Sequence, residues 1–559
     1  MHWLDWTVIA LYFCCIAGIT IWCGRHLKNT ADYFLAGRNA GFFLIGASIF
    51  SSNIGSEHIV GLAGQGASTG LAMAHWELHA WVLVLLAYVF VPFYYKSGVY
   101  TMPEYLEKRF GPKARWILSV VSLVAYIFTK VSVTVYAGAL VFESLLPGTF
   151  GSPEAAFWVG AFLTVTITGI YTVIGGMKAV MYTEAPQAIL LILGSCFVSF
   201  YGLHALGGWS ELIAMAKPHA QQFALWRPLS DPDFPWLGVV IASPIIGIWY
   251  WCTDQYIVQR TLTARNLTQA RRGALFGGLL KVTPVLIFLV PGLIGWALNE
   301  RGIIHIPLKE MADGTMGING DQVFPTLVAT LLPVGIRGLI IACLLAALMS
   351  SLASLFNSSA SLFTVDIYEK IRPGRTQAHY VLVGRAATVV VVGLGILWIP
   401  VMKLVSSGGL YQYLQSVQGF LAPPIAAVFL LGLFWPRINS NGAVWGLSCG
   451  FVLGMIKLCL QTFFGTTAGK IDSPHFLAVI GDFNFLYATG VLFVISVAIV
   501  IVASFLTDAP PDIKTRGLTY GTVRNQPDVK ASWGTGNTVL ATIVILLVIS
   551  MYLYFSFWL

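Results

Sequence analysis

Hydrophobic residues occur in this chain in long runs separated by short polar stretches. An apolar run of about 20 residues is what an α-helix needs to cross the hydrocarbon core of a bilayer. The pattern predicts an all-α polytopic membrane protein with 14 transmembrane helices, at about residues 4–24, 40–65, 70–95, 114–146, 155–175, 180–205, 236–260, 273–298, 326–365, 380–403, 408–434, 441–462, 484–507 and 537–558. Because the loops between them are too short to bury a core, we expect residues 1–559 to form a single membrane domain.

The second of these runs is a poor membrane helix. Between apolar flanks it holds a polar centre, which consists of Ser51, Ser52, Asn53, Gly55, Ser56, Glu57 and His58. Backbone that leaves helical geometry at membrane depth is tolerated only where protein shields it or where it lines a wet cavity. We therefore predict that residues 51–58 form an unwound hinge, with carbonyls that face a cation and side chains that face a polar solute.

A second run, 236–260, is also interrupted, by Pro244, Gly247 and Asp254. It lies five predicted helices after the first. Paired interruptions at corresponding places in two halves of a chain are typical of transporters built from inverted repeats, which bind their substrates between the repeats. Two unrelated Gly and Pro kinks are the alternative interpretation.

Composition and charge agree with a membrane protein and indicate its orientation. Of the residues, 57% are hydrophobic and 10% are charged, against about 25% charged in soluble domains. The first run begins within MHWLD, has no basic leader, and is long enough to span, so it is expected to be a retained helix and not a signal peptide. Most Lys and Arg residues lie in alternate loops, within 25–38, 96–115, 260–272, 370–375 and 514–530. The positive-inside rule then predicts that both termini are extracytoplasmic. The net charge of +8 is explained by these basic residues at the membrane edges, so no nucleic-acid partner is expected.

Ionisable side chains inside predicted spans are candidates for function, because each costs about 2.5–3.5 kcal/mol to insert. Glu77 and Lys281 both lie well inside such spans. They are expected to pair, or to hold a polyhydroxyl ligand through the three donors of the ammonium group and the acceptors of the carboxylate. A purely structural ion pair is the alternative. His58 and Gln415 add neutral donors and acceptors, although such residues alone are often satisfied core groups.

Aromatic residues accompany the interrupted segments. Tyr250, Trp251 and Tyr411 flank them, and flat apolar rings suit the C–H face of a sugar and can seal a cavity. Tryptophan in a membrane helix is more often an interface anchor, but the depth of Trp251 in its run argues against that role.

The run AALMSSLAS is a candidate cation site. Ala347, Ser350 and Ser351 are spaced i, i+3 and i+4, so they share one helix face. Two hydroxyls and a carbonyl there, opposite carbonyls of the unwound segment, would give a hard cation its oxygen shell. Serine in membrane helices also serves close packing. The sequence contains no HExxH, G-x-S-x-G or P-loop motif, so nothing in it indicates an enzyme.

Longer strings resemble the sodium/solute symporter family, and within it the sodium/glucose cotransporter group. These strings are DYFLAGR (32–38), SSNIGSEHIVGLAG (51–64), YTMPEYLEKRF (100–110), WYWCTDQYIVQRTL (249–262), LMSSLASLFNSSASLFTVDIY (348–368) and APPIAAVFLLGLFWPRINSNGAVWG (422–446). The resemblance implies a five-plus-five inverted-repeat (LeuT-like) core over about 40–205 and 236–434. The flanking helices are then about 4–24, 441–462, 484–507 and 537–558. It also implies a multi-pass protein of the plasma membrane.

The same resemblance assigns site residues by motif. The Na⁺ ligands it implies are the carbonyls of Ser51, Ile54 and Ala347 with the hydroxyls of Ser350 and Ser351. The sugar-binding residues it implies are Asn53, His58, Glu77, Trp251, Lys281 and Gln415. Tyr250 resembles the inner gate and Tyr411 the outer gate.

Three positions depart from the family pattern. Glu184 stands where the family usually has Asp, on a possible Na⁺ exit route. Ala353 stands where members with a second Na⁺ site have a hydroxyl, which favours one Na⁺ per sugar. Gln418 replaces a small hydroxyl residue and leaves the choice of hexose open.

The function that these observations imply is Na⁺-coupled symport of a glucose- or galactose-type hexose by alternating access. Its partners are then the sugar, Na⁺ and the bilayer. Two alternatives remain: Na⁺-coupled transport of another small polar solute such as myo-inositol, and a sugar-gated cation channel or sensor.

Overall fold

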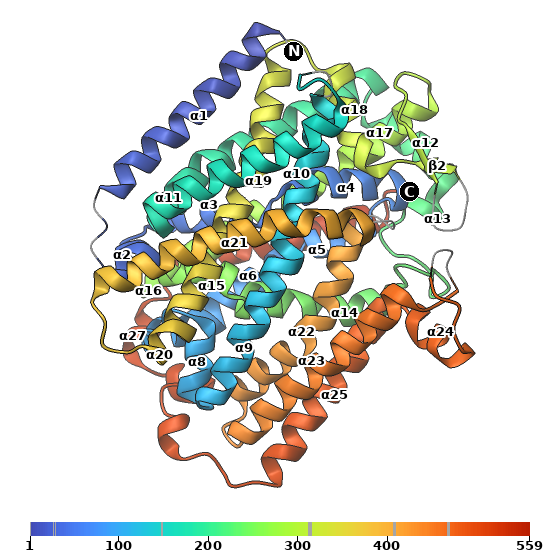
Figure 1. Ribbon diagram of the computed structural model, residues 1–559. Helices are drawn as coiled ribbons and strands as arrows, with labels where there is room; N and C mark the ends of the chain where they lie inside the picture. Colours follow the sequence, from blue (N-terminus) through green and yellow to red (C-terminus); the bar gives the residue numbers. More distant parts are fainter. Residues whose placement is uncertain are drawn as a thin grey trace.

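The computed structural model describes residues 2–25, 27, 29–146, 149–310, 316–405, 410–466 and 470–559. These residues are helical almost throughout (Figure 1). Among them, twelve helical segments are long and apolar enough to cross a membrane, namely Trp3–Gly24, Ala74–Ser97, Pro112–Leu145, Pro153–Leu206, Trp236–Thr253, Leu267–Glu300, Ile336–Ile371, Gln377–Pro400, Leu414–Phe434, Ser440–Phe463, Phe485–Phe505 and Thr535–Ser556. The expectation of a helical polytopic membrane protein is confirmed.

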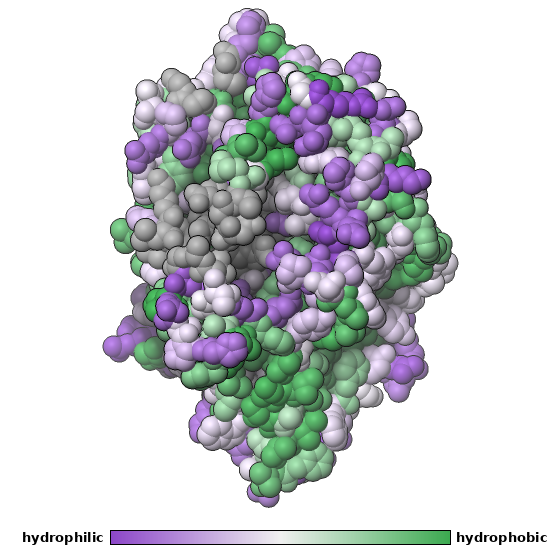
Figure 2. Space-filling model, turned by 90° about the vertical axis from the view of Figure 1, so that its right-hand side faces the viewer, coloured by the Kyte–Doolittle hydropathy of each residue, from purple (hydrophilic) through white to green (hydrophobic). Residues whose placement is uncertain are grey.

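Seven of the membrane-crossing elements are single helices. They are α1 (Trp3–Gly24), α11 (Pro153–Leu206), α21 (Gln377–Val405), α22 (Leu410–Phe434), α23 (Ser440–Phe463), α25 (Phe485–Phe505) and α28 (Thr535–Ser556). Large hydrophobic side chains of these helices are exposed, among them Leu397 of α21 and Val494 of α25. Hydrophobic residues cover the lower part of the molecule in Figure 2, the height at which α23 and α25 lie in Figure 1. Such apolar outer faces suit contact with lipid.

The elements near the centre are divided into shorter helices. They are α3 (Phe42–Asn53) and α4 (Ser56–Thr69); α5 (Ala74–Glu77), α6 (Ala80–Leu85), η2 (Leu86–Phe90) and α7 (Val91–Ser97); α9 (Pro112–Ala125), η3 (Tyr126–Val131) and α10 (Ser132–Leu145); α14 (Trp236–Ile248), η5 (Trp249–Thr253) and α15 (Gln255–Leu262); α16 (Leu267–Lys281), η6 (Val285–Leu289) and α17 (Val290–Glu300); α19 (Ile336–Ser361), η7 (Leu362–Tyr368) and α20 (Glu369–Ile371). The segments η2, η3, η5, η6 and η7 are π-helical, a form that often accompanies functional sites.

The expected helices 155–175 and 180–205 lie on either side of Gly176 within α11, where the backbone leaves helical geometry with a φ of 53° that favours glycine. One expected helix boundary is wrong. The expected helix 326–365 is two elements, because α18 (Gly320–Leu331) ends before a turn and α19 begins at Ile336. Apolar content alone does not mark that turn, which contains Pro333 and Gly335.

The connections contain more regular structure than the polar loops we expected. Their elements are α2 (Thr30–Leu35), η1 (Ala36–Arg38), α8 (Met102–Arg109), α12 (Trp209–Ala216), η4 (Lys217–His219), α13 (Ala220–Phe223), the hairpin of β1 (Leu308–Glu310) and β2 (Met316–Ile318), α24 (His475–Asp482), η8 (Asp512–Lys514), α26 (Tyr520–Val523) and α27 (Pro527–Ala531). The two strands pair antiparallel.

The connections separate into two groups in space. Those rich in Lys and Arg carry α2, α8, α20 and α27, toward the lower left of Figure 1, whereas α12, α13, β2 and α24 lie toward the right. The C-terminal end belongs with the second group, because Trp226 Nε1 donates to Ser556 Oγ at 2.8 Å. Asp5 accepts from the backbone N–H of Gly338 at 2.9 Å, so the N-terminus lies at the start of α19.

Glycines let the divided helices approach closely at the centre of the molecule. A Cβ on Gly66 of α4 would lie 2.2 Å from the carbonyl oxygen of Leu289, and one on Gly292 of α17 would lie 2.0 Å from that of Ala63. Small residues serve this purpose in membrane proteins, where lipid offers no hydrophobic drive for helix association. The broken helix α3–α4 is therefore held tightly against its neighbours.

Candidate functional site

The helix α3 ends at Asn53, inside the polar stretch where the sequence predicts a break, but the break is short. Ile54 has φ −87° and ψ 98°, and Gly55 is extended, so regular coiling stops at these two residues only. Residues 51–53 stay helical and His58 lies in the first turn of α4, which corrects the expected hinge of 51–58. The N–H of Gly55, freed by the break, points to Nδ1 of His58 at 3.4 Å.

The helix α14 is interrupted after a π-helical turn. The chain leaves helical geometry at Asp254, which has φ −79° and ψ 128°. The Asp254 carboxylate caps α15 by accepting from the N–H of Tyr256 at 3.3 Å. The break therefore follows Pro244 and Gly247 by several residues, and an N-cap of the usual kind stabilises it.

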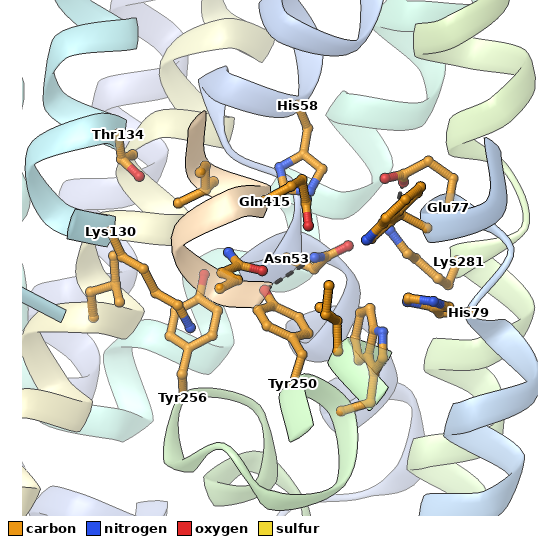
Figure 3. Close-up of a pocket in the computed structure, with 16 residues that line it drawn as sticks. Asn53, His58, Glu77, His79, Lys130, Thr134, Tyr250, Tyr256, Lys281 and Gln415 are labelled. Atoms are coloured by element: carbon orange, nitrogen blue, oxygen red, sulfur yellow. Dashed lines mark hydrogen bonds and ion pairs between the residues drawn. The ribbon is translucent and has the colours of Figure 1, made fainter. Parts of the chain in front are cut away.

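A pocket lies between these two breaks (Figure 3). Its space between protein atoms is about 570 Å³, including the part open to solvent. All six residues expected to bind substrate line it, together with Tyr250. The full lining is Asn53, His58, Trp76, Glu77, His79, Lys130, Thr134, Ile246, Tyr250, Trp251, Tyr256, Lys281, Leu355, Leu414, Gln415 and Gln418.

The expected ion pair forms at one side of this pocket. Lys281 Nζ lies 2.6 Å from Glu77 Oε2, and both side chains are buried. The same nitrogen lies 5.5 Å from the ring centre of Trp251. An aromatic face, two charges and His79, whose Nε2 is 2.7 Å from Ser243 Oγ, thus meet at one wall of the pocket.

Two buried oxygens in the pocket have no hydrogen-bond partner among the described residues. They are Asn53 Oδ1 and Gln415 Oε1. The amide nitrogen of Asn53 does have one, since it donates to the hydroxyl of Tyr250 at 3.1 Å. A buried acceptor without a partner costs about 1–3 kcal/mol, so two of them in one pocket indicate a ligand that donates hydrogen bonds.

The candidate cation residues of α3 and α19 also meet. Ser350 Oγ lies 2.8 Å from the carbonyl oxygen of Ser51 and 2.9 Å from that of Ala347. Ser351 Oγ donates to the carbonyl of Ser52 at 3.1 Å. All of these residues are buried. Carbonyl and hydroxyl oxygens are the ligands that hard cations take, and Ile54, the fifth expected ligand, is the first residue of the break.

Glu184 of α11 lies directly beside this cluster. Its backbone carbonyl accepts from Ser51 Oγ at 2.8 Å. Its carboxylate accepts from the hydroxyls of Ser48 and Ser354, and Arg260 Nη2 lies 3.4 Å away. The carboxylate is therefore neutralised by an arginine within the membrane, and it links α3, α15 and α19.

Sequence reasoning missed a second ion pair, at the edge of the pocket. Lys130 Nζ lies 2.6 Å from Asp254 Oδ2, and it is 4.8 Å from the ring centres of both Tyr250 and Tyr256. Both charged side chains are buried, and the Tyr126 hydroxyl also bonds to Asp254. Lys130 is an ionisable group inside an apolar run, so the rule that found Lys281 could have found it.

The second ion pair separates the pocket from a further cavity. Lys130 and Gln418 line both spaces, and Asp254 lines the second, which holds about 360 Å³ and lies between α9 and α22. The expected outer gate, Tyr411, lies outside the residues whose side chains the structure describes.

Comparison with known proteins agrees with this architecture. The family model of the sodium:solute symporter family matches residues 33–450. Sodium/glucose cotransporter 1 of Sus scrofa is 39% identical over 536 residues, which cover 91% of this chain and 80% of that protein. Sodium/myo-inositol cotransporter of Mus musculus is 38% identical over 548 residues, with 92% and 75% covered.

Solved structures show the same fold. The substrate-bound, outward-open structure of a Na⁺-coupled sialic acid symporter matches with a TM-score of 0.75 at 23% identity, over 90% of this chain and 98% of that one. The structure of MhsT in complex with L-phenylalanine matches with a TM-score of 0.51 at 14% identity, over 82% and 98%.

Broken helices that meet around a pocket and a cluster of oxygen atoms are typical of secondary transporters, and this is the class of protein that the fold indicates. Within that class, this chain belongs to the sodium:solute symporter family. It is a sodium-coupled solute symporter and not an enzyme, and sodium is its coupling ion.

Proposed function

We propose that this symporter carries a hexose of the glucose or galactose type by alternating access, with one Na⁺ per sugar. The observation that carries the proposal is the shared position of the two sites. Ser51 and Ser52 contribute carbonyls to the oxygen cluster, and the next residue, Asn53, lines the pocket. A ligand in either site therefore acts on the same three residues of α3.

The Na⁺ site is proposed to consist of the carbonyls of Ser51, Ile54 and Ala347 with the hydroxyls of Ser350 and Ser351. The short distances of Ser350 to two of these carbonyls support this set. A serine hydroxyl that donates its hydrogen to a carbonyl still has lone pairs for a cation. Ala353 offers no hydroxyl, which favours a single ion.

The sugar is proposed to bind Asn53, His58, Glu77, Trp251, Lys281 and Gln415. A polyhydroxyl ligand can donate to the two oxygens that have no partner among the described residues and can accept from Lys281. The Trp251 ring suits the apolar face of a pyranose. The similarity to sodium/glucose cotransporter 1 of Sus scrofa, at 39% identity, also supports a hexose.

Two gates and an exit complete the proposed cycle. Tyr250, which the Asn53 amide binds, is proposed as the inner gate and Tyr411 as the outer gate. Na⁺ leaves past Glu184, whose carbonyl is one hydrogen bond away from Ser51. Binding of Na⁺ favours the outward-open form and organises α3 for sugar, and rocking of the two repeats then opens the site inward.

The proposed topology has 14 crossings, five-plus-five inverted repeats over about 40–205 and 236–434, and both termini outside the cell. This count is reached when α11 is divided at Gly176 and α3–α4 is added as one broken crossing. The grouping of the Lys- and Arg-rich connections at one end supports the orientation. We place the protein in the plasma membrane.

One Na⁺ provides enough free energy for concentrative uptake. Movement of one charge down 100 mV supplies about 2.3 kcal/mol, and a tenfold Na⁺ gradient adds about 1.4 kcal/mol. The sum of about 3.7 kcal/mol sustains a sugar gradient of about 500-fold.

Uptake by proteoliposomes tests the proposed substrate. We expect labelled glucose or galactose to accumulate above the external concentration when Na⁺ is outside, and not when choline replaces it. An excess of unlabelled hexose should abolish this uptake, whereas equal myo-inositol should not. Preferential inhibition by myo-inositol would replace the hexose by a cyclitol, and sugar-evoked currents without accumulation would indicate a channel or sensor.

A further inference from the structure

Two hydrogen bonds join the two helix breaks side by side. The Tyr256 hydroxyl donates to the carbonyl of Ser52, and the Asn53 amide donates to the Tyr250 hydroxyl at 3.1 Å. Ser52 and Asn53 directly precede the break of α3–α4, whereas Tyr250 and Tyr256 stand on either side of the break at Asp254. The two broken helices are thus linked at neighbouring residues.

The carbonyl of Ser52 is shared between the oxygen cluster and the pocket. It accepts from Ser351 Oγ at 3.1 Å as well as from Tyr256. A carbonyl oxygen has two lone pairs, so it can accept both bonds. It is available for them because α3 ends at Asn53 and helical pairing stops at the break.

The ring of Tyr256 forms part of the pocket wall. The side chain is buried, and its ring centre lies 4.8 Å from Lys130 Nζ and 6.1 Å from the ring centre of Tyr250. The backbone N–H of Tyr256 points to the Tyr126 hydroxyl at 3.1 Å. Tyr256 therefore bonds to the Ser52 carbonyl through its hydroxyl and lines the pocket with its ring.

We propose that Tyr256 is a positioning residue that transmits Na⁺ binding to the substrate pocket, through its hydrogen bond to the carbonyl shared with Ser351. An ion held by Ser351 and the neighbouring Ser51 carbonyl fixes the end of α3. The bond to Ser52 then fixes the start of α15, and with it the Tyr256 and Tyr250 rings against the pocket. This inference rests on the sodium-coupled sugar transport proposed above.

The substitution Tyr256→Phe tests this role with little risk to the fold. Phenylalanine keeps the ring that lines the pocket, and the Ser52 carbonyl keeps its bond from Ser351. The matched control is Tyr94→Phe, because the buried Tyr94 hydroxyl donates at 2.7 Å to the carbonyl of Cys252 in the same broken helix. That bond lies away from the oxygen cluster, and Tyr94 does not line the pocket.

The experiment measures the equilibrium binding affinity of labelled sugar for the full-length protein in proteoliposomes, at saturating Na⁺ and with choline in its place. Allosteric coupling typically changes affinity by about 5- to 150-fold. We expect Tyr256→Phe to reduce the wild-type ratio by about fivefold or more, the effect of one lost hydrogen bond, and Tyr94→Phe to retain it. By linkage, the effect of sugar on the apparent Na⁺ affinity must fall by the same factor. A merely structural defect that weakens sugar binding equally with and without Na⁺ would leave the ratio unchanged.

An unchanged ratio in Tyr256→Phe, in a protein whose wild type couples Na⁺ to sugar, would overturn the inference and leave the proposed function intact. An equal loss in Tyr94→Phe would also overturn it, since the effect would then belong to the helix as a whole. A wild type that takes up no hexose with Na⁺ would contradict the proposed function, and the inference with it.

Discussion

Ser351→Ala is expected to abolish most Na⁺-driven transport at physiological Na⁺ concentrations. The hydroxyl is buried between α3 and α19 and is a proposed ligand of the ion. Interactions of a polar group with a charge contribute about 1.5–3 kcal/mol, and each 1.4 kcal/mol is about tenfold. The apparent Na⁺ affinity should therefore fall by about 10- to 100-fold, measured as the Na⁺ dependence of initial sugar uptake.

The control for this substitution is Ser359→Ala. Ser359 lies on the same helix, eight residues and thus about 12 Å further along, and its buried hydroxyl has no hydrogen-bond partner among the described residues. The Ser359→Ala protein should take up sugar with the Na⁺ dependence of the wild type. If Ser351→Ala keeps that dependence as well, the ion does not bind at this serine.

Gln415→Ala is expected to lower the apparent sugar affinity by about tenfold or more without loss of folded protein. The Gln415 Oε1 atom is buried in the pocket and has no partner among the described residues. Its removal therefore breaks no hydrogen bond of that oxygen within the protein, while a bound sugar loses an acceptor worth about 1–3 kcal/mol. The measurement is the concentration of sugar that gives half-maximal uptake at saturating Na⁺.

The neighbouring substitution Ser416→Ala separates a contact with the sugar from a general change in α22. Ser416 is buried next to Gln415 but does not line the pocket. We expect its sugar affinity to equal that of the wild type, with the same amount of protein in the membrane. Equal kinetics for both variants would mean that Gln415 does not touch the substrate.

The sequence predicts where the helices break but not how far the breaks extend. Polar residues at mid-membrane led us to expect unwinding from 51 to 58, yet only Ile54 and Gly55 leave the helix. Ser52 remains helical, and its hydroxyl donates to the carbonyl of Ser48 at 2.7 Å, one turn earlier. A serine that bonds within its helix and one that ends it look alike in a sequence.

The candidate site was also only partly predictable. The cost of burying a charge identified Glu77 and Lys281, which do pair. The same rule applies to Lys130, whose partner Asp254 lies at the second break, several residues beyond Pro244 and Gly247. Which buried charges meet depends on helix packing, and local sequence patterns do not contain that information.

The most direct test of the account is simultaneous measurement of Na⁺ and sugar entry into the same proteoliposomes. The shared use of residues 51–53 by both sites predicts that neither substrate moves without the other. With radiolabelled Na⁺ and hexose at saturating concentrations, we expect sugar-dependent entry of one Na⁺ for each sugar. Sugar entry that continues at an equal rate without Na⁺ entry, or Na⁺ entry that sugar does not change, would contradict the account.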